Sequence, residues 1–433
     1  MDLLFSNITI ITMQASQPVL HHAYLGVTSS KICYLSTEAP LEPAKRTIDG
    51  KNRLLMPGLI NTHSHLPMTI LRGYADNCNL QDWLFKHIFP AEAKLNRQAI
   101  GIGASLGVAE MLRTGTTSVS DMYFYIPEIA KVTLSSGIKA NICNGLTSFD
   151  SLSFDFQKNS SYLESLEVLR DYHLADHGRI KLDASIHAEY TSHISAWKAV
   201  VDFAGEYNLN MQIHLSETEL EHQNCIAKHG KTPAELFYEC GALDIRATLA
   251  HCVWVSDEDI DLLVEKDATA AHNPVSNLKL ASGIARVTEM QKRGLNVSLG
   301  TDGVSSNNSL DMFEEVKMCS LLQKSITRDA SALPAPEALK IATVNGAFAQ
   351  GRENETGRLA VDFDADIIML DLSVPNLNPC HQEIDTIVYS ASGKDVIMTM
   401  VMGKILYENG IYYTLDLEKI YYELENQVLP LLR

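Results

Sequence analysis

Two histidines end an apolar segment in the first fifth of the sequence, which reads LINTHSH. His63 and His65 are two positions apart, and residues two apart on a β-strand project from the same face. One metal ion could therefore bind both imidazoles, although a polar strand end explains an isolated pair of this spacing equally well.

Later apolar segments also end in residues that bind metals or transfer protons. These residues are His187, His214, Glu217, His251, His272 and Asp302. Three histidines and one carboxylate form a zinc site that leaves one coordination position for water, as a hydrolytic metal requires. The repetition favours a metal-dependent hydrolytic site over a series of ordinary polar strand ends.

These residues belong to apolar, β-branched segments that alternate with amphipathic stretches. The segments are LLMPGLINTHSH, TSVSDMY, KANICNGL, IKLDASIHAEYT, MQIHLSET, ATLAHC, TAAHN and NVSLGTDG. Alternating strands and helices predict a parallel sheet. Eight strands ending in polar residues predict a closed (β/α)8 barrel of the TIM type at residues 58–365, with the site at the carboxyl ends of its strands.

Both ends of the chain have the composition of short β-strands. The N-terminal segments include LLFSNITIITM and HAYLGVTSSKICYLS, and the C-terminal ones include ADIIMLDLS and DVIMTMVMGKILYENG. We expect residues 1–57 and 366–433 to form one small composite β-sandwich. The last residues, LEKIYYELENQVLPLLR, predict an amphipathic helix packed on the outside.

Composition restricts the partners and the compartment. The 433 residues are 46% apolar and carry a net charge of -18, which fits a folded protein without the basic surface that nucleic acids require. Eight scattered cysteines without a CxxC pair, together with an N-terminus that reads as a strand, predict a reducing, cytoplasmic location. No apolar run is long enough for a membrane span, and a homo-oligomer remains open.

Four segments closely resemble the methylthioadenosine/S-adenosylhomocysteine deaminase branch of the amidohydrolase superfamily. They are PGLINTHSHLPMTILRG, HLSET, HNPVSNLKLASGIA and GTDGVSSNNSLDMFEEV, within a resemblance that runs from about residue 50 to about residue 370. It implies a zinc-dependent barrel enzyme that hydrolytically deaminates 5′-methylthioadenosine, adenosine or S-adenosylhomocysteine to the inosine analogue and ammonia.

The resemblance also implies roles for individual residues. It makes His63, His65, His214 and Asp302 the ligands of one divalent ion, usually zinc, and Glu217, His251 and Asp302 the catalytic residues. Superfamily members with two metals use a modified lysine at the end of the fourth strand. Here that strand has Lys181 at its start and His187 near its end, so a single zinc or another single divalent ion is favoured.

The chemistry of deamination assigns a task to each catalytic group. A divalent ion would bring the pKa of a bound water towards neutrality, and Asp302 could take the released proton. Attack at C6 of adenine places negative charge on N1, so a protonated Glu217 is the natural acid there. His251 could hydrogen-bond the attacking hydroxyl.

Substrate contacts are implied for Trp83, Glu92, His187, Glu217 and Ser306. Trp83 would lie against the substrate, and Glu92 would accept hydrogen bonds from ribose hydroxyls. The alternative interpretations are that Trp83 is a core aromatic of a covering helix and that Glu92 belongs to a solvated helix face.

Two departures from the family pattern concern the group attached at the ribose 5′ position. Arg286 stands where a proline is usual, and Lys158 is the only cationic residue between Leu146 and Leu169, where carboxylate-binding relatives have arginines. We therefore expect methylthioadenosine or adenosine to be preferred over S-adenosylhomocysteine, unless Arg286 supplies the cation.

Two other functions compete with nucleoside deamination. One is aminohydrolysis or dechlorination of another nitrogen heterocycle, such as guanine, a pterin or a triazine, on the same metal site. The other is a noncatalytic metal-binding scaffold, which predicts the loss of Glu217 or Asp302; both are present. The zinc signature of polynucleotide deaminases, H-x-E with P-C-x-x-C, is absent.

Overall fold

The computed structural model describes residues 1–152 and 154–433, and its centre is formed by two parallel sheets. The first contains β6 (Leu59–Ser64), β7 (Thr116–Tyr123), β8 (Lys139–Asn144) and β9 (Ile180–Leu182). The second contains β10 (Ala184–Ile186), β11 (Met211–Leu215), β12 (Ala247–His251), β13 (Thr269–His272) and β14 (Asn296–Leu299). The predicted parallel sheets with intervening helices are confirmed.

The two parallel sheets meet along both of their margins. At one margin only Asp183 separates β9 from β10, and an isolated parallel bridge joins Leu146 to Ile186. At the other margin a parallel bridge joins Ser64 to Asp302. The fourth predicted strand is thus divided at Asp183, whose buried carboxylate accepts hydrogen bonds from neighbouring amide side chains.

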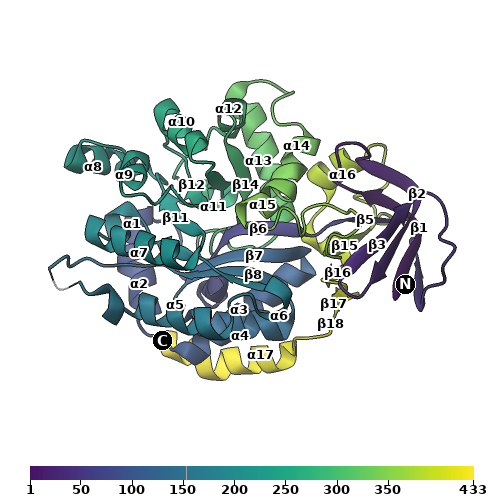
Figure 1. Ribbon diagram of the computed structural model, residues 1–433, viewed down its shortest axis with the longest axis horizontal. Coiled ribbons are helices and arrows are strands. Elements are labelled where there is room, and N and C mark those ends of the chain that lie inside the picture. Colours follow the sequence, from purple (N-terminus) through teal and green to yellow (C-terminus); the bar gives the residue numbers. More distant parts are fainter. Residues whose placement is uncertain (153) are drawn as a thin grey trace.

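Helices lie on the outer side of these strands (Figure 1). The helices that follow or connect the strands are η1 (Leu66–Leu71), α1 (Leu80–Asp82), η2 (Trp83–Ile88), α2 (Phe89–Glu92), α3 (Arg97–Arg113), α4 (Ile126–Ser136), η3 (Phe156–Lys158), α5 (Ser160–Asp171), α6 (Ala175–Gly178), η4 (Glu189–Thr191), α7 (Ile194–Tyr207), α8 (Glu219–His229), α9 (Pro233–Glu239), α10 (Asp257–Glu265), α11 (Pro274–Lys279), α12 (Val287–Arg293), α13 (Met312–Thr327), α14 (Ala335–Ile341) and α15 (Val344–Ala349). Their apolar faces and the strands share one large hydrophobic core.

Strands from both ends of the chain form a third, nine-stranded sheet. Its order is β18-β17-β16-β15-β5-β1-β2-β3, with β4 paired to β1. The strands are β1 (Leu3–Ile11), β2 (Val19–Thr28), β3 (Lys31–Ser36), β4 (Arg46–Asp49), β5 (Arg53–Pro57), β15 (Ile367–Asp371), β16 (Val396–Val401), β17 (Lys404–Glu408) and β18 (Ile411–Tyr412). A second, smaller apolar cluster belongs to this sheet, which lies to one side of the parallel strands (Figure 1).

The C-terminal residues leave this sheet and return to the helices. After α16 (Glu383–Ser390), η5 (Gly393–Asp395) and the last strands, the chain ends in α17 (Leu417–Glu423), η6 (Leu424–Val428) and α18 (Leu429–Leu432). The amide of Gln98 on α3 donates to the side-chain oxygen of Gln427 at 2.6 Å. The predicted terminal helical segment therefore packs on the outside of the helical layer (Figure 1).

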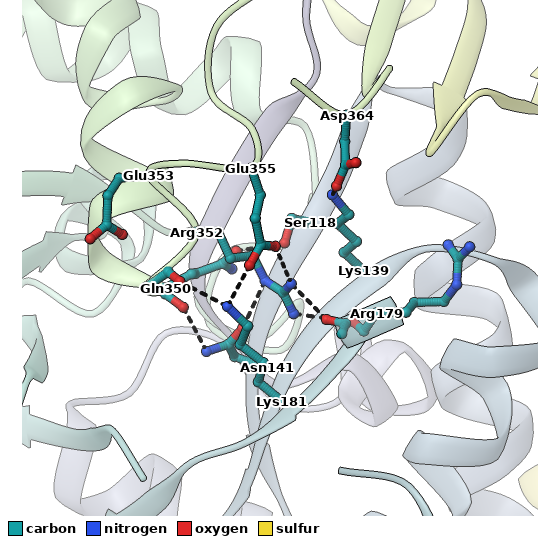
Figure 2. A network of polar contacts seen from close by, with 12 residues as sticks. Ser118, Lys139, Asn141, Arg179, Lys181, Gln350, Arg352, Glu353, Glu355 and Asp364 are labelled. Carbon is teal, nitrogen blue, oxygen red and sulfur yellow. Dashed lines mark hydrogen bonds and ion pairs between the residues drawn. The ribbon is translucent and has the colours of Figure 1, made fainter. Parts of the chain in front are cut away.

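A buried polar network connects the start of β8 and β9 to the segment that leads into β15 (Figure 2). The ammonium of Lys139 lies 2.6 Å from Asp364 and 2.7 Å from Asp366, and its side chain is 1% exposed. The buried guanidinium of Arg352 donates to main-chain carbonyls of Ala140 and Gly178. These bonds pair buried charges and main-chain carbonyls at the amino ends of the strands, whereas the predicted site lies at their carboxyl ends. The network is therefore structural.

Replacing Lys139 by methionine should lower the free energy of unfolding by about 3–5 kcal/mol, because two carboxylates would lose their buried partner. Lys131→Met is the matched control, since its ion pair with Glu128 on the surface should contribute less than about 1 kcal/mol. Denaturant unfolding of both variants measures the difference. Equal decreases in the free energy of unfolding would show that the buried ion pairs of Lys139 stabilise the fold no more than the surface pair of Lys131.

Candidate active site

Three histidines converge at the carboxyl ends of the parallel strands. His63 lies near the end of β6, His65 directly follows it, and His214 lies on β11. The ring centroid of His63 is 4.9 Å from that of His65 and 4.7 Å from that of His214. One nitrogen of each ring lies within 4.8 Å of the others, which is close enough for one ion to bind all three.

Hydrogen bonds orient two of these rings. Nδ1 of His65 donates to the carbonyl of Met122 at 2.5 Å, and Nδ1 of His214 donates to the carbonyl of His187 at 2.7 Å. These bonds assign the ring protons to Nδ1 and leave Nε2 free to bind a metal. Burial lowers the pKa of His63 to about 4, so its imidazole is in the neutral, metal-binding form at pH 7.

Asp302 completes the cluster from the segment after β14. Its Oδ1 lies 3.1 Å from Nε2 of His65 and 3.5 Å from Nε2 of His63. Its Oδ2 accepts hydrogen bonds from the hydroxyls of Ser276 at 2.6 Å and Ser306 at 2.8 Å. Burial alone would raise the pKa of Asp302, but the adjacent imidazoles of His63 and His65 outweigh it and hold that pKa well below its usual range.

This donor set fits a divalent ion such as zinc. Three imidazoles and a carboxylate are nitrogen and oxygen ligands that zinc accepts. Nε2 of His63 is buried and, among the described residues, has no hydrogen-bond partner of good geometry. A buried ring nitrogen without such a partner is explained if a metal takes that position.

Glu217 and His251 lie beside the cluster. Glu217 follows β11 and is 5% exposed, and its Oε2 lies 3.7 Å from Nε2 of His251. Nδ1 of His251 lies 2.8 Å from Oδ1 of Asn277, so the ring is held with Nε2 towards Glu217. Burial raises the pKa of Glu217 above its usual range, although His251 opposes the shift. A raised pKa favours the protonated carboxyl group, which is the form that can donate a proton.

The cluster opens into a cavity of about 310 Å³. Of the residues predicted to contact substrate, Trp83, Glu92, His187 and Glu217 line this cavity. The fifth, Ser306, is buried behind Asp302 and is not part of the described cavity wall. Apolar side chains of the covering helices α1, η2 and α2 form part of the remaining wall, and polar residues of the loop after β8 form another part.

Glu92 is directed into the cavity rather than into solvent. Its Oε1 accepts a hydrogen bond of 2.6 Å from the hydroxyl of Tyr123. Burial raises the pKa of Glu92 to about 7, against the opposing effect of that hydrogen bond. Trp83 is 7% exposed, and Nε1 of its indole has no partner among the described residues. Both side chains thus have polar atoms available to a ligand.

Arg286 and Lys158, the two cationic residues singled out from the sequence, lie outside the cavity wall. Arg286 forms an ion pair of 2.7 Å with Asp257 and donates to the carbonyl of Val255. Lys158 pairs with Asp155 at 2.8 Å and is exposed. Neither is among the described residues that line the cavity, and the wall supplied by the loop after β8 is uncharged.

Several residues that support the site were not singled out from the sequence. They are Tyr123, Ser276, Asn277 and Ser282. The last three belong to the segment HNPVSNLKLASG, and the available signal was that this segment is one of the motifs that carry the family resemblance. His272, which begins that segment, is buried, and neither of its ring nitrogens has a partner in the described part of the chain.

Parallel strands that end in such a cluster of imidazoles and carboxylates define the class of metal-dependent hydrolases with an α/β fold. Residues 54–406 match the amidohydrolase family, and the chain belongs to this family. The resemblance seen in its motifs is thereby confirmed. In the described part of the chain, no helix combines the length and hydropathy needed to cross a bilayer.

Two curated relatives and one solved structure are similar over nearly the whole chain. The 5-methylthioadenosine/S-adenosylhomocysteine deaminase of Thermoanaerobacter pseudethanolicus is 39% identical, with 100% of both chains covered. The 5′-deoxyadenosine deaminase of Methanosarcina barkeri is 41% identical over 97% of this chain and 96% of its own. An adenosine deaminase from Xanthomonas campestris with bound zinc is 30% identical, with a TM-score of 0.91 and 98% and 97% coverage.

Proposed function

We propose that this protein is a zinc-dependent enzyme that hydrolytically deaminates an adenine nucleoside to the inosine analogue and ammonia. The observation that carries this proposal is the placement of Glu217 and His251 in the same cavity as the histidine and aspartate cluster. The relatives named as deaminases of such nucleosides support it. The substrate is 5′-methylthioadenosine, adenosine or S-adenosylhomocysteine, or a close analogue.

Four side chains would hold one zinc ion: His63, His65, His214 and Asp302. When bound, the ion supplies Lewis acidity that makes a water molecule nucleophilic near neutral pH. Hydrogen bonds from Ser276 and Ser306 to one oxygen of Asp302 keep its carboxylate ionised beforehand, so that it can accept a proton from the attacking water and become neutral in that step. We place Ser306 in this supporting role rather than in direct contact with substrate.

The remaining groups act on the purine and the sugar. Glu217 donates its proton to N1 as negative charge develops there, and later helps to transfer a proton to the departing ammonia. Nε2 of His251 hydrogen-bonds the attacking hydroxyl. Trp83 packs against the substrate, Glu92 accepts hydrogen bonds from the ribose hydroxyls, and His187 contacts the purine or the ribose.

The same proposal includes the architecture. We propose that the two parallel sheets form one closed (β/α)8 barrel at residues 58–365, supported by the bridges at both margins. Residues 1–57 and 366–433 then form the composite β domain of the sandwich type together with the terminal helix, supported by the sheet that both ends share. We further propose a cytoplasmic enzyme whose partner is its small substrate.

Purified protein should contain about one zinc ion per chain. The only lysine of the β9–β10 segment, Lys181, bonds Glu355 and the carbonyl of Gly351, far along the strand from His187. A lysine that bridges two metals is therefore missing from the described site. Metal analysis of the dialysed protein tests this stoichiometry, and two tightly held ions that are both required for activity would contradict it.

Nucleosides with an uncharged 5′ group should have a higher kcat/KM than S-adenosylhomocysteine. A carboxylate entering the cavity would exchange its hydration for a wall without a lysine or an arginine among the described residues. Initial rates for 5′-methylthioadenosine, adenosine and S-adenosylhomocysteine measure this, and Arg286→Ala should leave the order unchanged because Arg286 already pairs with Asp257. A preference for S-adenosylhomocysteine that collapses in Arg286→Ala would reverse this conclusion.

The test of the proposed function is a panel that follows ammonia release. Adenine nucleosides should react, whereas guanine, a pterin and a chlorinated triazine should not react at comparable rates. Turnover confined to one of the other heterocycles would favour the competing aminohydrolase or chlorohydrolase function. Metal binding without any turnover would favour a scaffold.

A further inference from the structure

Ser282 is the one residue outside the proposed catalytic set whose side chain hydrogen-bonds the carboxyl group of Glu217 in the described structure. Its hydroxyl donates to Oε1 of Glu217 at 3.2 Å, although the two residues are 65 positions apart. Ser282 is 3% exposed, and its hydroxyl has no other partner among the described residues. This hydrogen bond therefore has no evident competitor from solvent or from the protein.

Trp254 fixes the backbone on both sides of this contact. Its indole Nε1 donates to the carbonyl of Ser282 at 2.7 Å, and its main-chain N–H donates to the carbonyl of Ser216 at 3.0 Å. Ser216 directly precedes Glu217, so one residue holds the two segments that carry the serine and the carboxylate. Gly283 permits this approach, because a Cβ at its φ of +126° would lie 2.9 Å from Val253.

The two carboxyl oxygens of Glu217 consequently have different surroundings. Oε1 accepts from Ser282, whereas Oε2 faces Nε2 of His251 at 3.7 Å. A hydroxyl that donates to Oε1 disfavours a proton on that oxygen, because two hydrogens would then compete for one contact. The acidic proton is thereby restricted to Oε2.

We propose that Ser282, held in place by Trp254, is a positioning residue that keeps the proton of Glu217 on Oε2. This inference rests on the proposed function, in which Oε2–H gives its proton to the purine N1 and Glu217 becomes a carboxylate. Without the hydroxyl, the carboxyl group can rotate and can present its unprotonated oxygen to the substrate. Proton transfer then becomes slower while binding of the nucleoside changes little.

The proposal predicts a specific kinetic pattern. Ser282→Ala should lower kcat about tenfold, as expected for losing one hydrogen bond, with KM within about twofold of wild type and zinc content unchanged. Ser282→Thr retains the hydroxyl and should recover most of kcat. Trp254→Phe keeps an aromatic ring but loses the indole N–H, so it should give a smaller decrease in kcat.

Ser320→Ala is the matched control. Ser320 lies on α13, outside the cavity, and is also buried; its hydroxyl donates to the carbonyl of Leu333 at 2.8 Å. This variant should lose a similar amount of stability without a change in kcat. Equal decreases in kcat for Ser282→Ala and Ser320→Ala, or an unchanged kcat in Ser282→Ala, would overturn the proposal.

Crystal structures separate this inference from the proposed function. In wild-type protein Oε1 of Glu217 should contact Ser282, and in Ser282→Ala the carboxyl group should rotate or occupy two orientations. A carboxyl group that stays in place in Ser282→Ala would overturn the inference even if nucleosides are deaminated. Wild-type protein that binds zinc but deaminates no adenine nucleoside would instead overturn the proposed function.

Discussion

Glu217→Gln is expected to lower kcat for nucleoside deamination by about 10²–10⁴-fold while the zinc content stays at the wild-type level. Glutamine has nearly the same volume and can still accept the hydrogen bond from Ser282, but it cannot give a proton to the purine ring. The carboxyl group is not one of the proposed metal ligands, so the ion should remain bound. Steady-state kinetics together with metal analysis of the same preparation measure both properties.

Glu219→Gln is a suitable control for this variant. Glu219 is the first residue of α8, only two positions from Glu217, but it is exposed and does not line the cavity. It should keep wild-type kinetics. If Glu217→Gln also remained within a few-fold of wild type, another group would have to supply the proton.

Asp302→Asn should have a comparably large effect, through two separate properties. The substitution removes the negative charge from the metal cluster and also the group that accepts the proton of the attacking water. We expect a lower zinc affinity and a decrease in kcat of at least about 10³-fold that excess zinc does not reverse. A zinc titration that follows both bound metal and kcat distinguishes the loss of zinc affinity from the loss of catalysis.

Asp311→Asn provides the comparison for Asp302→Asn. Asp311 accepts hydrogen bonds from the main-chain N–H groups of Phe313 and Gly393, so its substitution affects a helix terminus outside the metal cluster. The folded fraction of this variant should have normal zinc content and kcat. Full activity of Asp302→Asn at saturating zinc would contradict the role proposed for Asp302.

The sequence was sufficient for those features that depend on local pattern. His63 and His65 share a strand face because of the two-residue period, and the polar residues His214 and Asp302 are found at strand ends, as the alternation of strands and helices predicts. Strand-like composition at both termini likewise indicated that the two ends share a sheet, which the pairing of β5 with β15 shows.

Features that depend on contacts between distant segments were not predictable in this way. The hydrogen bond between Ser282 and Glu217 joins residues 65 positions apart, and no periodicity records it. The hydrogen bond that Ser306 donates to Asp302 spans only four positions, but no periodicity records it either. The ion pair of Arg286 with Asp257, 29 positions away, is another such contact.

The most direct test of the central claim is an analysis of the products formed from 5′-methylthioadenosine or adenosine in water enriched in heavy oxygen. The zinc-loaded enzyme should release one ammonia per nucleoside consumed and give the 6-oxo nucleoside with one heavy oxygen, while its glycosidic bond and 5′ group stay intact. Glu217→Gln should give almost none of this product in the same time. A zinc-loaded wild-type enzyme that left the amino group in place, or that released free adenine, would contradict hydrolytic deamination as the function of this site.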